Sequence, residues 1–230
     1  LLLMSNSNAI SANLFNRLPF DTTRDFIAIS TIGFFVMAIY VDQKSPYKTL
    51  QDLISDGKSN SKPVSMATIN IGSTQNLTAE LIKSKAQLNL QIIPFNNSPA
   101  VLTAVIGKQV GAGIDILTPI ISQSKTGNIR ILATTGKTRS PFLKNVPSAH
   151  EAGIIGLEAS SWNGLAAPAR TPILIINQLN VAIKHALSSQ TVQRRLNEIY
   201  VTSKASTPQE MQQLLESETL RWGSLILEAK

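Results

Sequence analysis

The sequence of 230 residues contains no cysteine and only two histidines. The absence of cysteine excludes disulfide scaffolds, zinc ribbons, iron–sulfur clusters and thiol nucleophiles. Aromatic residues make up 5% of the chain and charged residues 15%, whereas hydrophobic residues make up 43%. A chain with this much apolar surface buries a core, and the composition therefore excludes a disordered protein.

Long hydrophobic runs are absent as well. The longest uncharged apolar stretch, Phe26 to Val41, is too short to span a bilayer, which takes about 20 apolar residues. No basic segment precedes the opening Leu1-Leu2-Leu3-Met4. We therefore expect a soluble fragment that begins within a strand, with any signal peptide upstream of it.

Catalytic motifs are also missing. His150 and His185 are the only histidines, and the sequence has no G-x-S-x-G elbow, P-loop or G-x-G-x-x-G motif. Ser-x-x-Lys occurs at Ser55, Ser59 and Ser122, and the last of these matches shares Lys125 with a Lys-Thr-Gly triplet. A serine acyltransferase takes these two elements from separate segments, so we interpret the matches as chance in a sequence rich in Ser and Lys. The sequence predicts no enzyme, no metal site and no cofactor.

The net charge is +7, and the basic excess is concentrated in residues 116–150. Five basic residues in that segment are accompanied by no acid: Lys125, Arg130, Lys137, Arg139 and Lys144. They are spread along the segment with only Phe142 among them, so we expect no nucleic-acid binding. A basic excess of this kind favours small anionic ligands.

Short apolar runs alternate along the chain with helices that open on Ser/Thr-Pro, which is typical of an α/β fold with a mostly parallel sheet. The expected strands are residues 27–32, 36–41, 64–67, 91–93, 110–116 and 130–134. The expected helix starts are Ser98-Pro99, Thr118-Pro119, Ser140-Pro141, Thr171-Pro172 and the capping box of Thr207 to Glu210. Residues 56–63 are expected to form an exposed polar loop.

Small polar residues gather where the expected strands lead into helices, in residues 5–8, 68–74 and 96–100, and Asp115 lies near the end of another strand. The carboxyl ends of parallel strands meet at one edge of a sheet, where helix N-termini favour anions. Each loop alone is better explained by ordinary caps and turns, which Ser, Thr and Asn favour. Together they indicate a site for a small carboxylate.

Six segments, in order along the chain, carry a resemblance to one family. They are Leu18-Pro19-Phe20-Asp21 with Arg24-Asp25-Phe26, Gly72-Ser73-Thr74 with Ala79-Glu80-Leu81, Ile93-Pro94-Phe95 with Ser98-Pro99-Ala100, Ile114-Asp115, Arg130 to Gly153, and Ser161-Trp162-Asn163-Gly164-Leu165. These segments resemble the extracytoplasmic receptors of tripartite tricarboxylate transporters, the Bug-type or TctC-like solute-binding proteins.

The resemblance implies an α/β, two-lobed periplasmic-binding-protein fold of the flytrap, type II-like kind, truncated at its N-terminus. Lobe I would comprise residues 1–38 and 162–230, without its opening β-α-β unit, and lobe II residues 39–161. The function implied is capture of a small organic anion, a di- or tricarboxylate or related acid, and its delivery to membrane transporter subunits. The resemblance also implies a periplasmic location, and we expect a monomer.

The ligand-binding residues that the resemblance implies lie in the polar junctions described above. They are Ser5, Ser7, Asn8, Asn70, Gly72, Ser73, Asn96, Pro99, Ala100 and Asp115. Asp115 is expected to accept a hydrogen bond from a ligand hydroxyl or amine, or to orient a water. The family's usual histidines are Asn8 and Asn76 here, and its Lys-Gly is Asn96-Asn97, which leaves the identity of the carboxylate open.

Two other classes remain as alternatives. The effector-sensing domain of a LysR-type transcription regulator has a related two-lobed architecture, and it requires a helix-turn-helix upstream. An enzyme on a periplasmic-binding scaffold requires a base or nucleophile, which the sequence does not supply.

Overall fold

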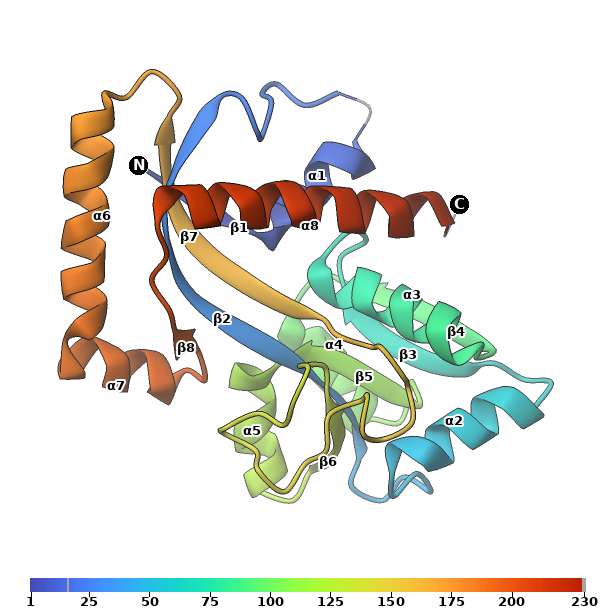
Figure 1. Ribbon diagram of the computed structural model, residues 1–230. Helices are drawn as coiled ribbons and strands as arrows, with labels where there is room; N and C mark the ends of the chain where they lie inside the picture. The colour runs from blue at the N-terminus through green and yellow to red at the C-terminus, as the bar shows by residue number, and fades with distance from the viewer. Residues whose placement is uncertain (16, 229–230) are drawn as a thin grey trace. The chain divides into compact units, whose positions relative to one another are not determined.

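The computed structural model describes residues 1–15 and 17–228. Contacts divide the chain into a terminal unit, residues 1–35 and 161–230, and a central unit, residues 36–160 (Figure 1). Strands β2 (Phe26–Asp42) and β7 (Ser160–Pro168) each contain residues of both units, so the chain passes from one unit to the other twice. That these units act as the lobes of a binding protein stays a prediction.

The terminal unit contains a sheet to which β1, β7, the first part of β2, and β8 contribute. Strand β1 (Leu2–Ser5) pairs antiparallel with β7, and β8 (Thr202–Ser203) pairs antiparallel with β2. Gly33 allows the second pairing, because a Cβ atom there would lie 2.6 Å from Val201 Cγ1. The glycine therefore marks a close approach of two segments and does not end the strand.

In its described residues, the terminal unit has the helices α1 (Asn6–Leu14), α6 (Ile173–Ser188), α7 (Gln190–Glu198) and α8 (Pro208–Glu228). One core cluster brings together Met4, Ala9, Trp162, Met211 and Leu215, from β1, α1, β7 and α8. A second, smaller cluster of Ile29, Ala167 and Ile176 packs α6 against β2 and β7. The sheet of this unit is thus covered by α1 and α8 through one cluster and by α6 through the other.

The predicted capping box at the start of α8 is confirmed. The Glu210 N–H donates to Thr207 Oγ1 at 3.1 Å, and the Thr207 N–H donates to Glu210 Oε2 at 2.7 Å. The bond from the Thr207 N–H, and a second one that the Thr207 hydroxyl donates to the same carboxylate oxygen, lower the pKa of Glu210 below its ordinary value. We expect Thr207→Ala to lower the unfolding free energy by about 1 kcal/mol, because a donor of the first helical turn loses its partner. Urea unfolding measures this change, and Thr207→Ser, which keeps the hydroxyl, is expected to restore most of it.

The central unit contains a five-stranded sheet in the order β6-β2-β5-β3-β4. The remaining strands are β3 (Val64–Ile69), β4 (Leu90–Phe95), β5 (Ala112–Ile116) and β6 (Ile129–Thr134). Strand β3 pairs parallel with β4 and with β5, whereas β2 lies antiparallel to both β5 and β6. The expectation of a parallel arrangement therefore holds for β3 to β6 and is wrong for β2.

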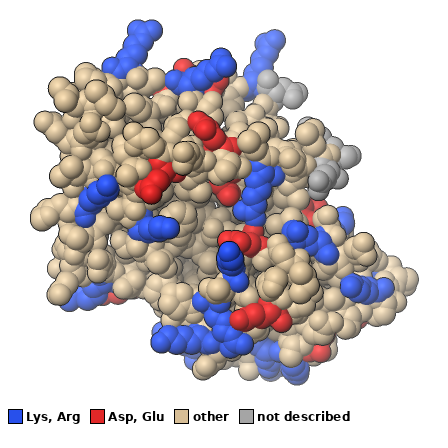
Figure 2. Space-filling model, viewed as in Figure 1, with Lys and Arg blue, Asp and Glu red and all other residues tan. Residues whose placement is uncertain are grey.

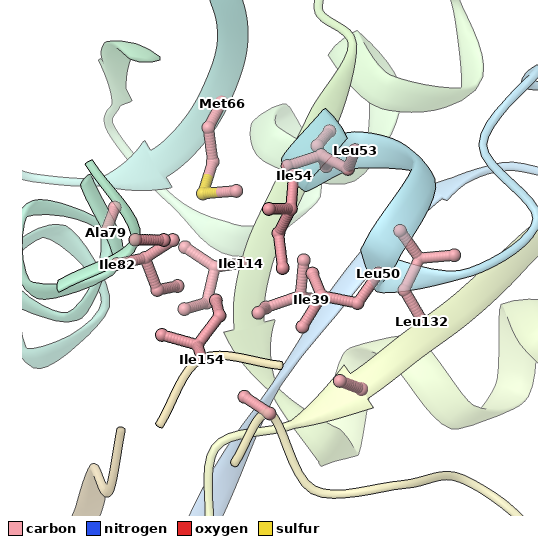
Figure 3. Packing of buried hydrophobic residues seen from close by; sticks show 14 of the residues in the cluster. Ile39, Leu50, Leu53, Ile54, Met66, Ala79, Ile82, Ile114, Leu132 and Ile154 are labelled. Carbon is pink, nitrogen blue, oxygen red and sulfur yellow. The ribbon is translucent and has the colours of Figure 1, made fainter. Parts of the chain in front are cut away.

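The helices of the central unit are α2 (Leu50–Ser59), α3 (Thr74–Ala86), α4 (Ser98–Ile106) and α5 (Leu117–Lys125). Its largest core cluster includes Ile39, Leu53, Met66, Ile82 and Ile114, from β2, α2, β3, α3 and β5 (Figure 3). Side chains from α2 and α3 meet side chains of the strands there, which fixes α3 on the sheet and with it the junction at the N-terminus of that helix.

Three local predictions are corrected by the structure. Residues 27–32 and 36–41 form one strand, β2, and residues 56–59 belong to α2, whose start has a capping box of Thr49 and Asp52. The helix expected at Ser140-Pro141 does not form, and residues 140–146 make consecutive turns instead. Pro147 leaves too few residues after Pro141 for a stable helix.

Among the described residues, no helix has both the length and the hydrophobicity needed to cross a membrane.

Candidate functional site

Three strand-to-helix junctions lie along one edge of the central sheet. The pairing of β3 with β4 runs from Val64 opposite Leu90 to Ile69 opposite Phe95, so the two strands end together. Ala67 lies opposite Gly113 of β5, which places the end of β5 at the same edge. Helices α3, α4 and α5 all begin there, and their N-termini give this edge a positive electrostatic potential.

The junction between β3 and α3 is stabilised by hydrogen bonds between residues close in the sequence. Gly72 has φ +79°, a conformation that favours glycine, and its N–H donates to Asn76 Oδ1 at 3.1 Å. Ser73 caps the helix by accepting from the Asn76 N–H at 3.1 Å, and its hydroxyl donates to the Ile69 carbonyl. The exposed Asn70 contributes its side chain to the outer surface of this junction.

The junction between β4 and α4 is capped by Asn97 and not by Ser98. Asn97 Oδ1 accepts from the Ala100 N–H at 2.9 Å, so a ligand that used this N–H would have to displace the Asn97 side chain. Pro99 has no N–H to offer. Asn96 and Asn97 are both exposed, and their amide side chains remain the accessible polar groups of this junction.

Asp115 lies below these junctions and is 1% exposed. Its Oδ1 accepts from Gln75 Nε2 of α3 at 3.0 Å and from the Ile116 N–H at 2.8 Å, and the Ser98 side chain of α4 lies near the carboxyl group. Burial raises the pKa of Asp115, and these hydrogen bonds oppose that effect only in part. The aspartate therefore links the first turn of α3 to β5.

No lysine, arginine or histidine occurs in residues 63–82, 89–107 or 109–124, which contain the three strands and their junctions. An anion at this edge would be held by amides, hydroxyls and helix N-termini and not by side-chain cations. On the face in Figure 2, Lys and Arg are interspersed with Asp and Glu. In the basic segment, Arg139 pairs with Glu151 at 2.9 Å.

The remaining predicted residues lie in the terminal unit, where β1 leads into α1. Ser5 and Asn8 form a capping box, in which the Ser5 N–H donates to Asn8 Oδ1 at 2.8 Å. Ser7 is exposed, and its N–H donates to Ser5 Oγ at 3.3 Å. These hydrogen bonds are those of a helix cap, which is the alternative that the sequence left open.

The structure thus brings seven predicted residues to one edge of the central sheet: Asn70, Gly72, Ser73, Asn96, Pro99, Ala100 and Asp115. Ser5, Ser7 and Asn8 share a separate junction in the other unit. Ligand contact by any of the ten stays a prediction. The sequence analysis did not single out Gln75 or the buried Tyr40 of β2. For Gln75, its position in the first turn of α3 was the signal that could have identified it.

Within the described part of the chain, no group of three or more histidine, aspartate and glutamate side chains lies close enough together to hold a metal ion.

The fold matches those of solved solute-binding proteins. Rpa4515 from R. palustris, solved with adipate, is 28% identical, with a TM-score of 0.87 over 97% of this chain and 75% of the other. MatC from Rhodopseudomonas palustris, solved with bound malate, is 23% identical, with a TM-score of 0.83 over 97% of this chain and 78% of the other. The predicted fold class, an α/β periplasmic binding protein, is confirmed.

The sequence comparisons identify the family within that class. The protein BugT from Bordetella pertussis is 27% identical over 99% of this chain and 71% of its own length. The family described as the tripartite tricarboxylate transporter family receptor matches residues 1–230. The chain belongs to this family of receptors, which confirms the resemblance and disfavours the LysR-type alternative.

Proposed function

We propose that the chain is a periplasmic receptor that binds a small organic dicarboxylate and delivers it to the membrane subunits of a tripartite transporter. The observation that carries the proposal is the meeting of three helix N-termini, without any cation, at the edge formed by β4, β3 and β5. Such an edge attracts a carboxylate through N–H groups and amides. Two similar proteins, Rpa4515 and MatC, were solved with adipate and malate, and both are dicarboxylates.

In this proposal Asn70, Ser73, Asn96 and the N-termini of α3 and α4 supply the ligand-binding groups of the central unit. Ser5, Ser7 and Asn8, in the terminal unit, stay predicted ligand-binding residues. Capping hydrogen bonds already occupy several of these groups. Specificity then rests on the amides that remain accessible, and the receptor is expected to act as a monomer without catalysing a reaction.

Adipate and malate are expected to raise the midpoint of thermal unfolding, because a ligand that binds only the folded state stabilises it by mass action. A thermal-shift series with rising ligand concentration measures the effect, and isothermal titration calorimetry gives the Kd. Mass analysis of the solution after incubation is expected to recover each acid unchanged. If neither these two acids nor any other di- or tricarboxylate shifts the midpoint, the proposed function is wrong.

A single substitution tests where the anion binds. Asn96→Asp places a negative charge at the α4 junction with almost no change of shape, and it is expected to raise the Kd for adipate about tenfold at low salt. Gln91→Glu makes the same kind of change at the other end of β4, on an exposed residue, and serves as the matched control. Equal effects of the two variants would place the anion elsewhere.

A further inference from the structure

The two oxygens of the Asp115 carboxyl group have different surroundings. Oδ1 accepts from Gln75 Nε2 and from the Ile116 N–H, whereas Oδ2 is buried and accepts no hydrogen bond from any residue that the structure describes. An ionised carboxylate buried in this way leaves half of its charge without a donor, which is costly. A protonated carboxyl group fits better, because Oδ1 then acts as the carbonyl acceptor and Oδ2 carries the proton.

Among the described residues of the elements around Asp115, no cation is placed to stabilise its ionised form. The neighbouring strand β3 and the helix α4 contain no titratable residue, and α5 has only Lys125, in its last turn. Helix α3 carries Glu80, Lys83 and Lys85 beyond its first turn. On β2, Tyr40 faces Asp115 and Asp42 lies further along the strand, at the other end of the sheet.

The Tyr40 hydroxyl supplies the polar group next to Asp115. Ala38 lies opposite Asp115 and Tyr40 lies opposite Gly113, so Tyr40 and Asp115 project from the same face of the sheet. The ring of Tyr40 is fully buried over Gly113, and its Oη has no hydrogen-bond partner among the described residues. Burial and the nearby Asp115 both raise the pKa of Tyr40, which therefore stays neutral.

We propose that Asp115 is a proton-linked positioning residue of the junction site, so that an anionic ligand at the N-termini of α3 and α4 is taken up together with one proton. The inference rests on the proposed function. While it is neutral, Asp115 accepts a hydrogen bond from Gln75 in the first turn of α3, and Ser98 at the start of α4 lies near its carboxyl group. The proton comes from solvent and binds Oδ2.

The coupling between anion binding and protonation of Asp115 follows from repulsion between like charges. Burial raises the pKa of Asp115 above its ordinary value of 3.8 in the free receptor. A carboxylate bound beside it adds a like charge and raises this pKa further. Binding of the anion therefore favours the protonated form of Asp115. By linkage, the affinity for the anion falls as the pH rises from the pKa of Asp115 in the free receptor to its higher pKa in the complex.

The test compares the wild-type chain with Asp115→Asn, using adipate as the probe. Asparagine keeps the shape and the Oδ1 acceptor but cannot ionise. We expect the wild-type Kd to rise with pH, by up to about tenfold per pH unit where a full proton is taken up. The variant is expected to bind adipate with a Kd that follows only the titration of adipate itself. Calorimetry in two buffers of different ionisation enthalpy measures the number of protons taken up when adipate binds.

A second measurement needs no ligand. Because the pKa of Asp115 is raised in the folded chain, the stability that its neutral form contributes is lost as the pH rises from about 3.8 through the raised value. The unfolding free energy of wild type is therefore expected to fall relative to that of Asp115→Asn over this range. Urea unfolding at a series of pH values measures the difference, and the comparison removes the contribution of all other groups.

The outcomes separate the two proposals. If adipate binds both proteins with the same pH dependence and no difference in proton uptake, the proton-linked role is wrong and the receptor function stands. If the wild-type chain binds no dicarboxylate at any pH, the proposed function fails, and the proton-linked uptake fails with it. If ligand-free wild type and Asp115→Asn show the same pH dependence of stability, Asp115 is not held neutral by the fold.

Discussion

Replacing Trp222 with alanine is expected to lower the free energy of unfolding by about 3–5 kcal/mol, the range for large aromatic side chains removed from a core. Trp222 is 0% exposed, and its Nε1 donates to Glu218 Oε2 at 2.7 Å and to Asn6 Oδ1 at 3.3 Å. The substitution removes the ring, leaves a cavity between α8 and α1, and takes away a donor to Asn6. Asn6 is the first residue of α1, so the junction that contains Ser5 and Ser7 loses a support.

Trp162 provides the signal for this measurement. The sequence contains two tryptophans, both in the terminal unit, and Trp162 is buried in the cluster that joins β7 to α8. Its fluorescence during urea unfolding therefore follows the unit in which the substitution is made. The control is Leu220→Ala on the same helix, where the side chain is 75% exposed, and a change within about 0.5 kcal/mol is expected. A loss below 1 kcal/mol for Trp222→Ala would contradict the packing described here.

The helix boundaries that the sequence predicted best are those with a local chemical signal. Thr207 and Glu210 form their capping box within one helical turn, as expected. At Thr118 the same Ser/Thr-Pro pattern was misleading, because α5 begins at Leu117 with no side-chain cap. The pattern indicates that a helix starts nearby, and the backbone path out of the strand decides which residue begins it.

The order and direction of the strands depend on contacts distant in sequence. Parallel β3, β4 and β5 follow from the alternation of strands and helices, which requires crossover connections. The insertion of β2 between β5 and β6, antiparallel to both, is set by pairings of Ala38 with Asp115 and with Thr134. No short-range pattern in the sequence encodes these pairings.

In the candidate site too, some features follow from local sequence and others from contacts distant in sequence. The polar junctions were predicted because strand ends in a parallel sheet lie at a common edge. The burial of Asp115 and its contact with Gln75 were not predicted, since both depend on how α3 packs on the sheet. The sequence therefore predicted which junctions meet at this edge, whereas the buried residues next to them emerged only from the packing.

Gly113→Ala is the sharpest test of that buried layer, with an expected loss of about 1–3 kcal/mol in unfolding free energy. A Cβ atom at residue 113 would lie 2.8 Å from Tyr40 Cζ and 2.9 Å from Val105 Cγ2. The Tyr40 ring is fully buried and has no free space to move into, so either the ring or α4 has to shift. Because both tryptophans lie in the other unit, far-UV circular dichroism during urea unfolding is the measurement.

Gly57→Ala is the matched control, since it adds the same methyl group in the same unit. There a Cβ atom would lie 3.4 Å from Leu88 Cδ2, an ordinary contact, and residue 57 is inside α2. Alanine favours a helix over glycine, so this variant is expected to be neutral or more stable by up to about 1 kcal/mol. Equal stability of the two variants would show that Tyr40 does not fill the space over Gly113. The proton-linked role of Asp115 would then lose Tyr40 as its polar neighbour and would rest on the unpartnered Oδ2 of Asp115 alone.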